Sequence, residues 1–134
     1  MRNIGFTLQE ILIVLVIVGI LVALALPNYT RMKDEALNKV ARSTLALVRA
    51  GEQIYRMEYG SFAAADATSN VNTILKLTIP TGADSRWEYK VVPVVGTPIT
   101  NAFTGKAQRT DAGATKVWCI SQASEEAYDA GCAW

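Results

Sequence analysis

The sequence contains no histidine, which removes the commonest general base and the commonest metal ligand of proteins together. Charge is also scarce: 13 Lys and Arg stand against 12 Asp and Glu, and a net charge near +1 gives no general attraction for nucleic acid. The chain has no glycine-rich phosphate loop, no His-Glu-x-x-His motif and no Cys/His cluster. We therefore expect neither an enzyme nor a direct nucleic-acid site, and no cofactor.

One stretch departs from an otherwise ordinary soluble composition. From Ile11 to Leu26 no side chain is polar. The residues from Phe6 to Leu26 span about 31 Å as a helix, which matches the hydrocarbon core of a bilayer. Apolar residues lie on every side of that helix, so it is not an amphipathic surface helix. We predict a hydrophobic transmembrane helix over residues 6–27.

A secretory signal peptide is the alternative interpretation of this run. Arg2 supplies a positive start, and Ala-Leu-Ala at 23–25 fits a cleavage site that would leave Leu26 as the first residue. Against it, Gln9 and Glu10 intrude before the apolar run, where a signal peptide seldom carries an acid. The helical pattern also continues past the supposed cut.

Beyond Pro27 the pattern becomes amphipathic. Apolar residues recur every three or four positions, polar residues fall largely between them, and Gly60-Ser61 ends the pattern. We therefore predict one long helix to about Tyr59, amphipathic over 28–59, with Gly19 and Pro27 as its points of flexibility. The apolar face is predicted from Tyr29, Met32, Ala36, Val40, Leu47, Val48, Ile54 and Tyr55.

Residues 60–134 are expected to form one globular head together with 28–59. Alternating apolar residues predict strands at 85–95 and 115–121, so the fold class is α+β, with two to four antiparallel strands covering the amphipathic part of the helix. Three segments are assigned from weaker patterns: 60–71 as a connecting loop, 72–80 as either a strand or a short helical turn, and 102–116, with Gly105 and Gly113, as hairpin and turn.

The N-terminal residues resemble the type IV pilins and their relatives, the type II secretion pseudopilins. The resemblance rests on GFTLQE at 5–10, on the apolar run with Gly19, and on ALPNY at 25–29. It combines a short basic leader that ends in Gly, a following Phe, and an acid at the fifth residue after the cut. It covers about the first 30 residues closely.

The resemblance implies three events at this end of the chain. A prepilin peptidase would remove the leader, residues 1–5, by cutting between Gly5 and Phe6, and Phe6 would then be N-methylated. Glu10 would pair with the Phe6 amine of a neighbouring subunit, since an opposite charge relieves the cost of an acid in apolar surroundings. The alternative for Glu10 is an interfacial acid that accepts N–H bonds at the start of its own helix.

The resemblance also bears on topology and on the two cysteines. It places the N-terminus in the cytoplasm and the head outside, although Arg31 and Lys33 after the span oppose the positive-inside rule. In an extracytoplasmic domain, Cys119 and Cys132 are typical of a disulfide, and the alternative is two free buried thiols in a cytosolic domain. The pair also resembles the disulfide-closed C-terminal loop of many type IV pilins, which most major pseudopilins lack.

Major pseudopilins bind calcium in their last loops, so the C-terminal acids were considered as ligands. Glu125, Glu126 and Asp129 follow no EF-hand spacing. We interpret them as a solvated turn and expect no metal site.

Three function classes remain. The favoured one, chiefly because of the cysteine pair, is a subunit of a type IV pilus that serves adhesion, motility or DNA uptake. The second is a pseudopilin of a type II secretion system, and the third is a membrane-anchored periplasmic domain. The first implies a helical homopolymer, a prepilin peptidase and an inner-membrane assembly platform as partners. It also implies residence in the inner membrane before assembly and in an extracellular pilus afterwards.

Overall fold

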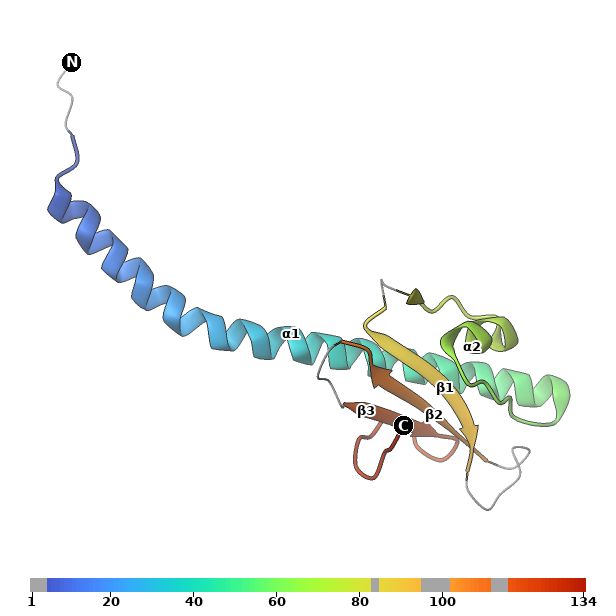
Figure 1. The fold of residues 1–134 in the computed structure, drawn as a ribbon. Coiled ribbons are helices and arrows are strands. Elements are labelled where there is room, and N and C mark those ends of the chain that lie inside the picture. The colour runs from blue at the N-terminus through green and yellow to red at the C-terminus, as the bar shows by residue number, and fades with distance from the viewer. Residues whose placement is uncertain (1–4, 83–84, 95–101, 112–115) are drawn as a thin grey trace. The chain divides into compact units, whose positions relative to one another are not determined.

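The computed structural model describes residues 5–82, 85–94, 102–111 and 116–134. These residues form, in chain order, a long helix, a short helix and three strands (Figure 1). They divide into two compact units, the first ending at Ala36 and the second running over Leu37–Trp134. The elements are α1 (Leu8–Tyr59), α2 (Thr68–Leu75), β1 (Trp87–Pro93), β2 (Phe103–Arg109) and β3 (Val117–Ser121).

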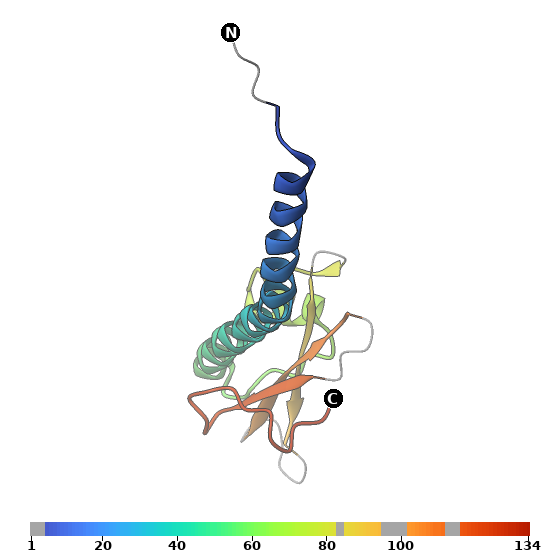
Figure 2. The same ribbon diagram turned by 90° about the vertical axis from the view of Figure 1, so that its left-hand side faces the viewer.

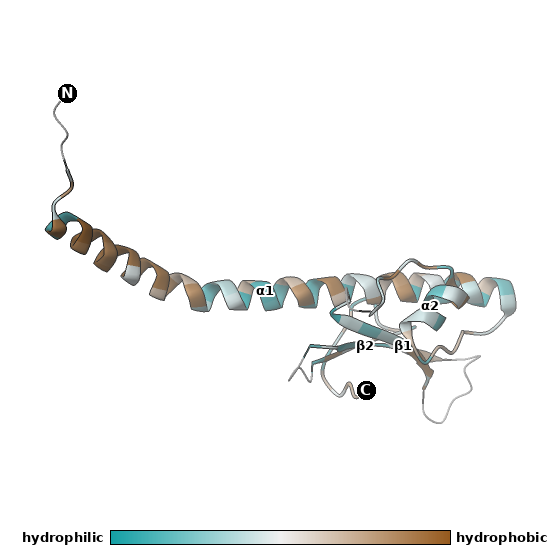
Figure 3. Ribbon diagram, turned by 45° about the horizontal axis from the view of Figure 1, so that its top comes forward, coloured by the Kyte–Doolittle hydropathy of each residue, from teal (hydrophilic) through white to brown (hydrophobic). Residues whose placement is uncertain are grey.

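The first unit consists mainly of the apolar part of α1. The colouring of Figure 3 shows this part as almost continuously hydrophobic. Every large apolar side chain described from Phe6 to Leu26 is at least 48% exposed. By length and composition α1 is the one described helix that could cross a membrane, with a mean hydropathy of 2.9 over 18 residues. None of the residues that the structure describes covers this apolar surface, so it requires a lipid or protein environment.

The helix continues through Pro27. Proline has no N–H to donate within the helix, so one backbone hydrogen bond is missing at this position. Thr30 lies one turn after Pro27, and its hydroxyl donates to the Pro27 carbonyl at 3.0 Å. The predicted single helix to Tyr59 is therefore confirmed.

In the second unit, a three-stranded antiparallel sheet in the order β1-β2-β3 packs on the later part of α1 (Figures 1 and 2). The register places Val91, Gly105 and Ile120 side by side across the three strands. α2 lies beside β1. A long helix with a small antiparallel sheet confirms the predicted α+β fold class, and three strands fall within the predicted two to four.

Gly105 in β2 lies close to both α1 and β3. A Cβ atom there would lie 3.1 Å from Cγ2 of Ile120 and 3.7 Å from side-chain atoms of Leu45 and Val48 on α1. A Cβ atom would therefore press on Ile120 while making ordinary contact with α1, so glycine suits the tight packing of β2 against β3 at this point. Around this point the core is closed by the apolar residues Ala41, Phe62, Val71, Leu75, Trp87, Tyr89, Val91, Phe103 and Ala107.

The sequence placed the apolar face of the second half of α1 correctly only in part: Val48 is buried and Tyr55 packs against the core, but other predicted residues do not face the sheet. The residues that are buried along this part of the helix are Ala41, Leu45, Val48, Gly51 and Glu52. Three of the predicted face residues, Val40, Leu47 and Ile54, are instead 53%, 49% and 56% exposed. The prediction followed the bulkier apolar residues, whereas the sheet packs on a neighbouring row of the helix that begins with the small residue Ala41.

Two predicted segments outside the helix also need correction. Residues 102–116 were expected to be hairpin and turn, but Phe103–Arg109 is the central strand β2; Gly113 lies outside the described residues. The segment 72–80 proves helical as far as Leu75, and the predicted loop 60–71 is shorter because α2 begins at Thr68. The strands predicted at 85–95 and 115–121 are confirmed as β1 and β3 over their described residues.

Candidate assembly site and disulfide-closed loop

The start of α1 is closed by a reciprocal contact between Thr7 and Glu10. One carboxylate oxygen, Oε2 of Glu10, accepts from the Thr7 N–H and from the Thr7 hydroxyl, each at 3.3 Å. The Glu10 N–H in turn donates to the Thr7 hydroxyl oxygen at 3.3 Å. This is a capping box, which satisfies N–H groups that have no partner within the helix. In the single chain Glu10 therefore caps its own helix, as the alternative interpretation of this acid expected.

The predicted cleavage junction lies just before this cap. Gly5 and Phe6 are in non-helical backbone, and Phe6 is 81% exposed. The space around Gly5 is open, since a Cβ atom there would meet nothing within 4 Å. The first four residues of the predicted leader lie outside the described residues. An exposed, non-helical peptide bond is a geometry that a protease can engage.

Gly19 and Pro27, the predicted points of flexibility, both lie in continuous helix. A Cβ atom at Gly19 would meet nothing within 4 Å, so no packing contact in the chain requires glycine there. The flexibility of both positions stays a prediction.

At the other end of the chain, Cys119 and Cys132 form a disulfide with a Cα–Cα distance of 5.9 Å. It closes a loop that returns to β3, where Cys119 and Tyr128 exchange backbone hydrogen bonds of 2.8 and 2.9 Å. Lys116 and Asp129 form an ion pair at 3.5 Å beside it. The predicted disulfide and the C-terminal loop that it closes are confirmed.

Beyond the disulfide, the last two residues contact two lysines of the sheet. Lys90 and Lys106 lie opposite each other in the β1–β2 register. The Lys106 ammonium donates to the Ala133 carbonyl at 2.5 Å, and that of Lys90 lies 3.9 Å from the Trp134 ring centroid. Partial burial, together with the like charge of Lys90, lowers the pKa of Lys106. The C-terminus therefore offsets part of the repulsion between these lysines.

Replacing both cysteines with Ser is expected to lower the free energy of unfolding of the second unit by about 2–4 kcal/mol, because the unfolded chain is no longer constrained. All three tryptophans lie in this unit, so their fluorescence during urea unfolding of the detergent-solubilised protein measures the change. Ala130→Ser, an exposed change in the same loop, is the control and should leave stability unaltered. Full alkylation of both thiols in freshly isolated wild-type protein, without prior reduction, would contradict the prediction.

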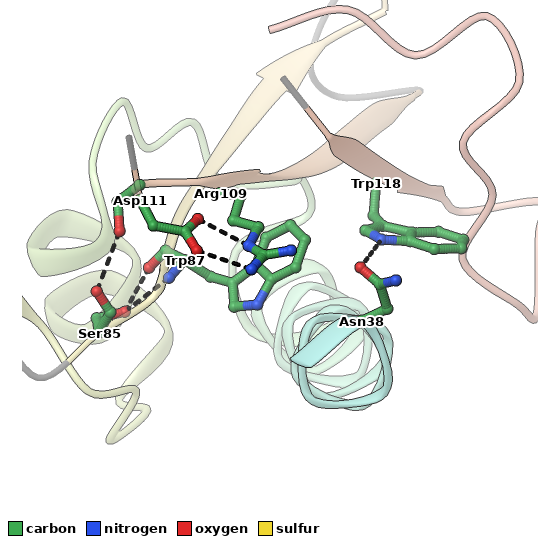
Figure 4. A network of polar contacts seen from close by, with 7 residues as sticks. Asn38, Ser85, Trp87, Arg109, Asp111 and Trp118 are labelled. Atoms are coloured by element: carbon green, nitrogen blue, oxygen red, sulfur yellow. Dashed lines mark hydrogen bonds and ion pairs between the residues drawn. The ribbon is translucent and has the colours of Figure 1, made fainter. Parts of the chain in front are cut away.

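A polar network fixes the sheet relative to the second part of α1 (Figure 4). The Trp118 indole N–H donates to the Asn38 amide oxygen on α1 at 3.5 Å. At the end of β2, Arg109 contacts the Asp111 carboxylate at 2.7 Å, and this hydrogen bond keeps the pKa of Asp111 below its usual value. These contacts hold elements in place and do not converge on a shared cavity.

Two of the C-terminal acids that were candidate calcium ligands, Glu126 and Asp129, lie beside different basic side chains. Glu126 lies 3.8 Å from Arg42, and Asp129 pairs with Lys116. Within the described ranges, no three Cys, Asp or Glu side chains are grouped so that they could hold a metal ion.

Sequence reasoning missed two polar residues. The role of Thr7 was available from the Thr-x-x-Glu spacing before an apolar run, which is a sequence signature of a capping box. Glu52 was grouped with the solvent-facing residues of α1, but its side chain has no exposed surface. The signal was its spacing, because Ala41, Leu45, Val48 and Glu52 follow one another at intervals of four, three and four residues.

No protein-family model and no solved structure matches the chain. Three characterised proteins do. The chain is 46% identical over 54 residues, 40% of its length, to the type IV narrow pilus major component PilA5 of Thermus thermophilus, covering 47% of that protein. It is 35% identical over 78 residues, 58% of its length, to the type II secretion system core protein G of Pseudomonas aeruginosa, covering 52% of it.

The third relative is the type IV major pilin protein PilA of Myxococcus xanthus, 35% identical over 65 residues, 46% of this chain and 30% of that protein. The chain thus matches about half of the length of the first two relatives and less of the third. These similarities agree with the apolar helix, the small antiparallel sheet and the GFTLQE start. Over these matched residues the chain is similar to two type IV pilins and to a type II secretion core protein.

Proposed function

We propose that this protein is a structural subunit that polymerises through its N-terminal helix into a type IV pilus. The observation that carries the proposal is the apolar part of α1, whose large side chains are all at least 48% exposed between Phe6 and Leu26. A bilayer covers such a surface before assembly, and the helices of neighbouring subunits cover it in a filament. Both environments remove the same apolar area from water.

Within this proposal Glu10 changes partners during assembly. In the isolated chain its carboxylate is exposed and caps α1 through Thr7, so it is accessible to a second chain. Cleavage before Phe6 would create an α-amine, and the amine of a neighbouring subunit would then pair with Glu10. A charge-assisted contact in apolar surroundings is stronger than the cap that it replaces. We also propose a prepilin peptidase and an inner-membrane assembly platform as partners.

A pseudopilin of a type II secretion system is the second candidate, since one relative is a core protein of such a system. The Cys119–Cys132 disulfide favours the pilus, because it resembles the closed C-terminal loop of many type IV pilins. Deleting the gene separates the two functions. Loss of sheared surface filaments that contain this protein supports the pilus, whereas normal filaments together with a defect in protein secretion support the pseudopilin.

Protein isolated from cells is expected to begin at Phe6 and to carry an added methyl group on its α-amine. The expectation rests on the GFTLQE motif at 5–10, and the exposed, non-helical Gly5-Phe6 junction ahead of the capped helix is consistent with it. Intact-mass and N-terminal peptide mass spectrometry measure both features. Gly5→Val should leave the leader attached, whereas Gly19→Val, the same substitution inside the apolar helix, should be cleaved normally. A mature terminus at Leu26 would instead identify a secretory signal peptide and remove the basis for a filament.

A further inference from the structure

A carboxylate lies in the interior of the second unit. Among the described Asp, Glu, Lys and Arg residues Glu52 alone is buried, with an exposed fraction of 0%. It continues the row of α1 side chains that face the sheet. Ionised carboxylates at such positions are normally paired with a cation, because burying a lone charge is costly.

Glu52 instead binds the loop between α1 and α2, residues 60–67. Its Oε2 accepts the Ala63 N–H at 2.8 Å. Its other oxygen, Oε1, is buried and has no hydrogen-bond partner among the described residues. The loop is also held by Phe62, whose ring centroid lies 4.7 Å from that of Phe103. The later part of the loop pairs with β1, where Ala65 and Val91 exchange backbone hydrogen bonds of 3.0 and 2.6 Å. Glu52 is therefore the polar side chain that attaches the first part of the loop, around Phe62 and Ala63, to α1.

The charged groups of α1 near Glu52 have other partners. Arg49 donates from Nη2 to the Gln122 carbonyl at 3.2 Å. Arg56 lies over the Phe62 ring at 4.9 Å. Neither forms an ion pair with Glu52 among the described residues, so the helix supplies no countercharge.

The elements that pack on α1 supply none either. Residues 60–65 and α2 contain no titratable side chain, and Asp66 accepts a hydrogen bond from Asn70 at 2.5 Å. In the sheet, Tyr89 hydrogen-bonds to Thr44 and Arg109 to Asp111. The remaining charged groups of the paired strands, Glu88, Lys90 and Lys106, alternate with the buried residues of β1 and β2 and so lie on the outer face.

Burial without a countercharge raises the pKa of Glu52 to about 7, although the Ala63 hydrogen bond acts in the opposite direction. The folded position therefore favours the neutral acid. The stability that the neutral Glu52 carboxyl gives the closed form is fully present at low pH. It is lost progressively as the pH rises from about 4.5 to about 7, and it changes little above that.

We propose that Glu52 is a protonation-controlled latch for the α1–α2 loop. The neutral acid keeps the first part of the loop, around Phe62 and Ala63, closed, while the Ala65–Val91 pair holds the later part to β1. The ionised form has an unsolvated oxygen, and opening of the loop lets that oxygen reach water. Opening also uncovers Phe62, which is 3% exposed in the closed form, so the subunit presents more apolar surface as the pH rises through neutrality.

The test is hydrogen exchange of the Ala63 amide in the full-length, oxidised protein in detergent micelles, measured from pH 5 to pH 8 and corrected for the intrinsic rate. If the carboxyl titrates at about 7 when closed and 4.5 when open, the opening equilibrium rises roughly 70-fold over this range. The Cys119 amide is the internal control, because it donates to the Tyr128 carbonyl in a part of the chain far from Glu52 in sequence. Its opening equilibrium should show no such rise.

Two variants sharpen the test. Glu52→Gln keeps an acceptor for Ala63 but cannot ionise, so its opening should be independent of pH. Glu58→Gln removes an exposed carboxylate of the same helix and should behave as the wild type. A pH-independent Ala63 amide in the wild type overturns the proposal, as does an unchanged pH dependence in Glu52→Gln. If Glu52→Gln does not fold, the titration of the Glu52 carboxyl in the wild type, followed by its ¹³C chemical shift, decides. A titration midpoint near pH 4.5 that does not coincide with the pH dependence of Ala63 exchange also overturns the proposal.

Discussion

Glu10→Gln is expected to give a protein that is cleaved and held in the membrane but that yields few filaments. The substitution removes a charge from an apolar segment, so insertion should be at least as favourable as in the wild type. Under the proposed assembly, however, the Phe6 amine of the neighbouring subunit loses its countercharge in poorly solvated surroundings. Loss of one partner of a buried pair costs about 3–5 kcal/mol, and a filament repeats this cost at every subunit.

The measurement compares the membrane pool with sheared surface filaments by immunoblot, with mass spectrometry to establish that Phe6 is the first residue in both. Glu35→Gln is the matched control, since it makes the same chemical change at an exposed carboxylate of α1 and should leave the filaments normal. Thr7→Val separates docking from capping, because it removes the hydroxyl of the cap while leaving the Glu10 carboxylate in place. It should lower filament yield much less than Glu10→Gln, since an N-cap contributes only about 1 kcal/mol.

Two outcomes would count against docking. Normal filaments from Glu10→Gln would mean that Glu10 serves only to cap its own helix. An equal loss of filaments in Thr7→Val and Glu10→Gln would assign the defect to a frayed helix start. Thr7→Val removes the hydroxyl bonds of the cap and keeps the charge, whereas Glu10→Gln removes the charge and keeps an acceptor oxygen, so the two variants separate capping from electrostatic docking.

The parts of the fold that could be predicted from the sequence are those fixed by local composition. An unbroken apolar run from Ile11 to Leu26 can satisfy its backbone in a membrane only as a helix, and the periodic pattern extends that helix to Tyr59. The strand β1 alternates clearly between buried and more exposed residues, so its period of two was evident. Cys119 and Cys132 offered one possible pairing.

The parts that could not be predicted depend on contacts between distant segments. The strand β2 contains glycine, alanine and four polar residues after Phe103, and it is the central strand because it pairs with both β1 and β3, with Gly105 packed against Ile120 and α1. Glu52 is buried because the loop 60–67 folds over it, which the helical pattern alone does not reveal. In both cases a small or polar residue is buried only because distant segments pack around it, so the local sequence pattern does not predict its burial.

Phe103 begins this unpredicted strand and supplies much of the core. It is the largest fully buried side chain described, it lies opposite Pro93 in the sheet, and its ring packs on Phe62. Its backbone N–H also donates to the Gln122 side chain at 3.2 Å, which links β2 to the segment after β3. Phe103 therefore joins the central strand, the α1–α2 loop and the C-terminal region.

Phe103→Ala is expected to lower the free energy of unfolding of the second unit by about 3–5 kcal/mol, because the lost ring leaves a cavity that a strand paired on both sides cannot close. Urea unfolding followed by tryptophan fluorescence measures this in the detergent-solubilised, oxidised protein. Met57→Ala, which shortens a side chain that is 79% exposed, is the control and should change stability by less than about 0.5 kcal/mol. A loss below about 1 kcal/mol for Phe103→Ala would mean that β2 does not occupy the centre of the core. Since the apolar part of α1 belongs to the other unit, the destabilised variant should still enter the membrane and be cleaved before Phe6.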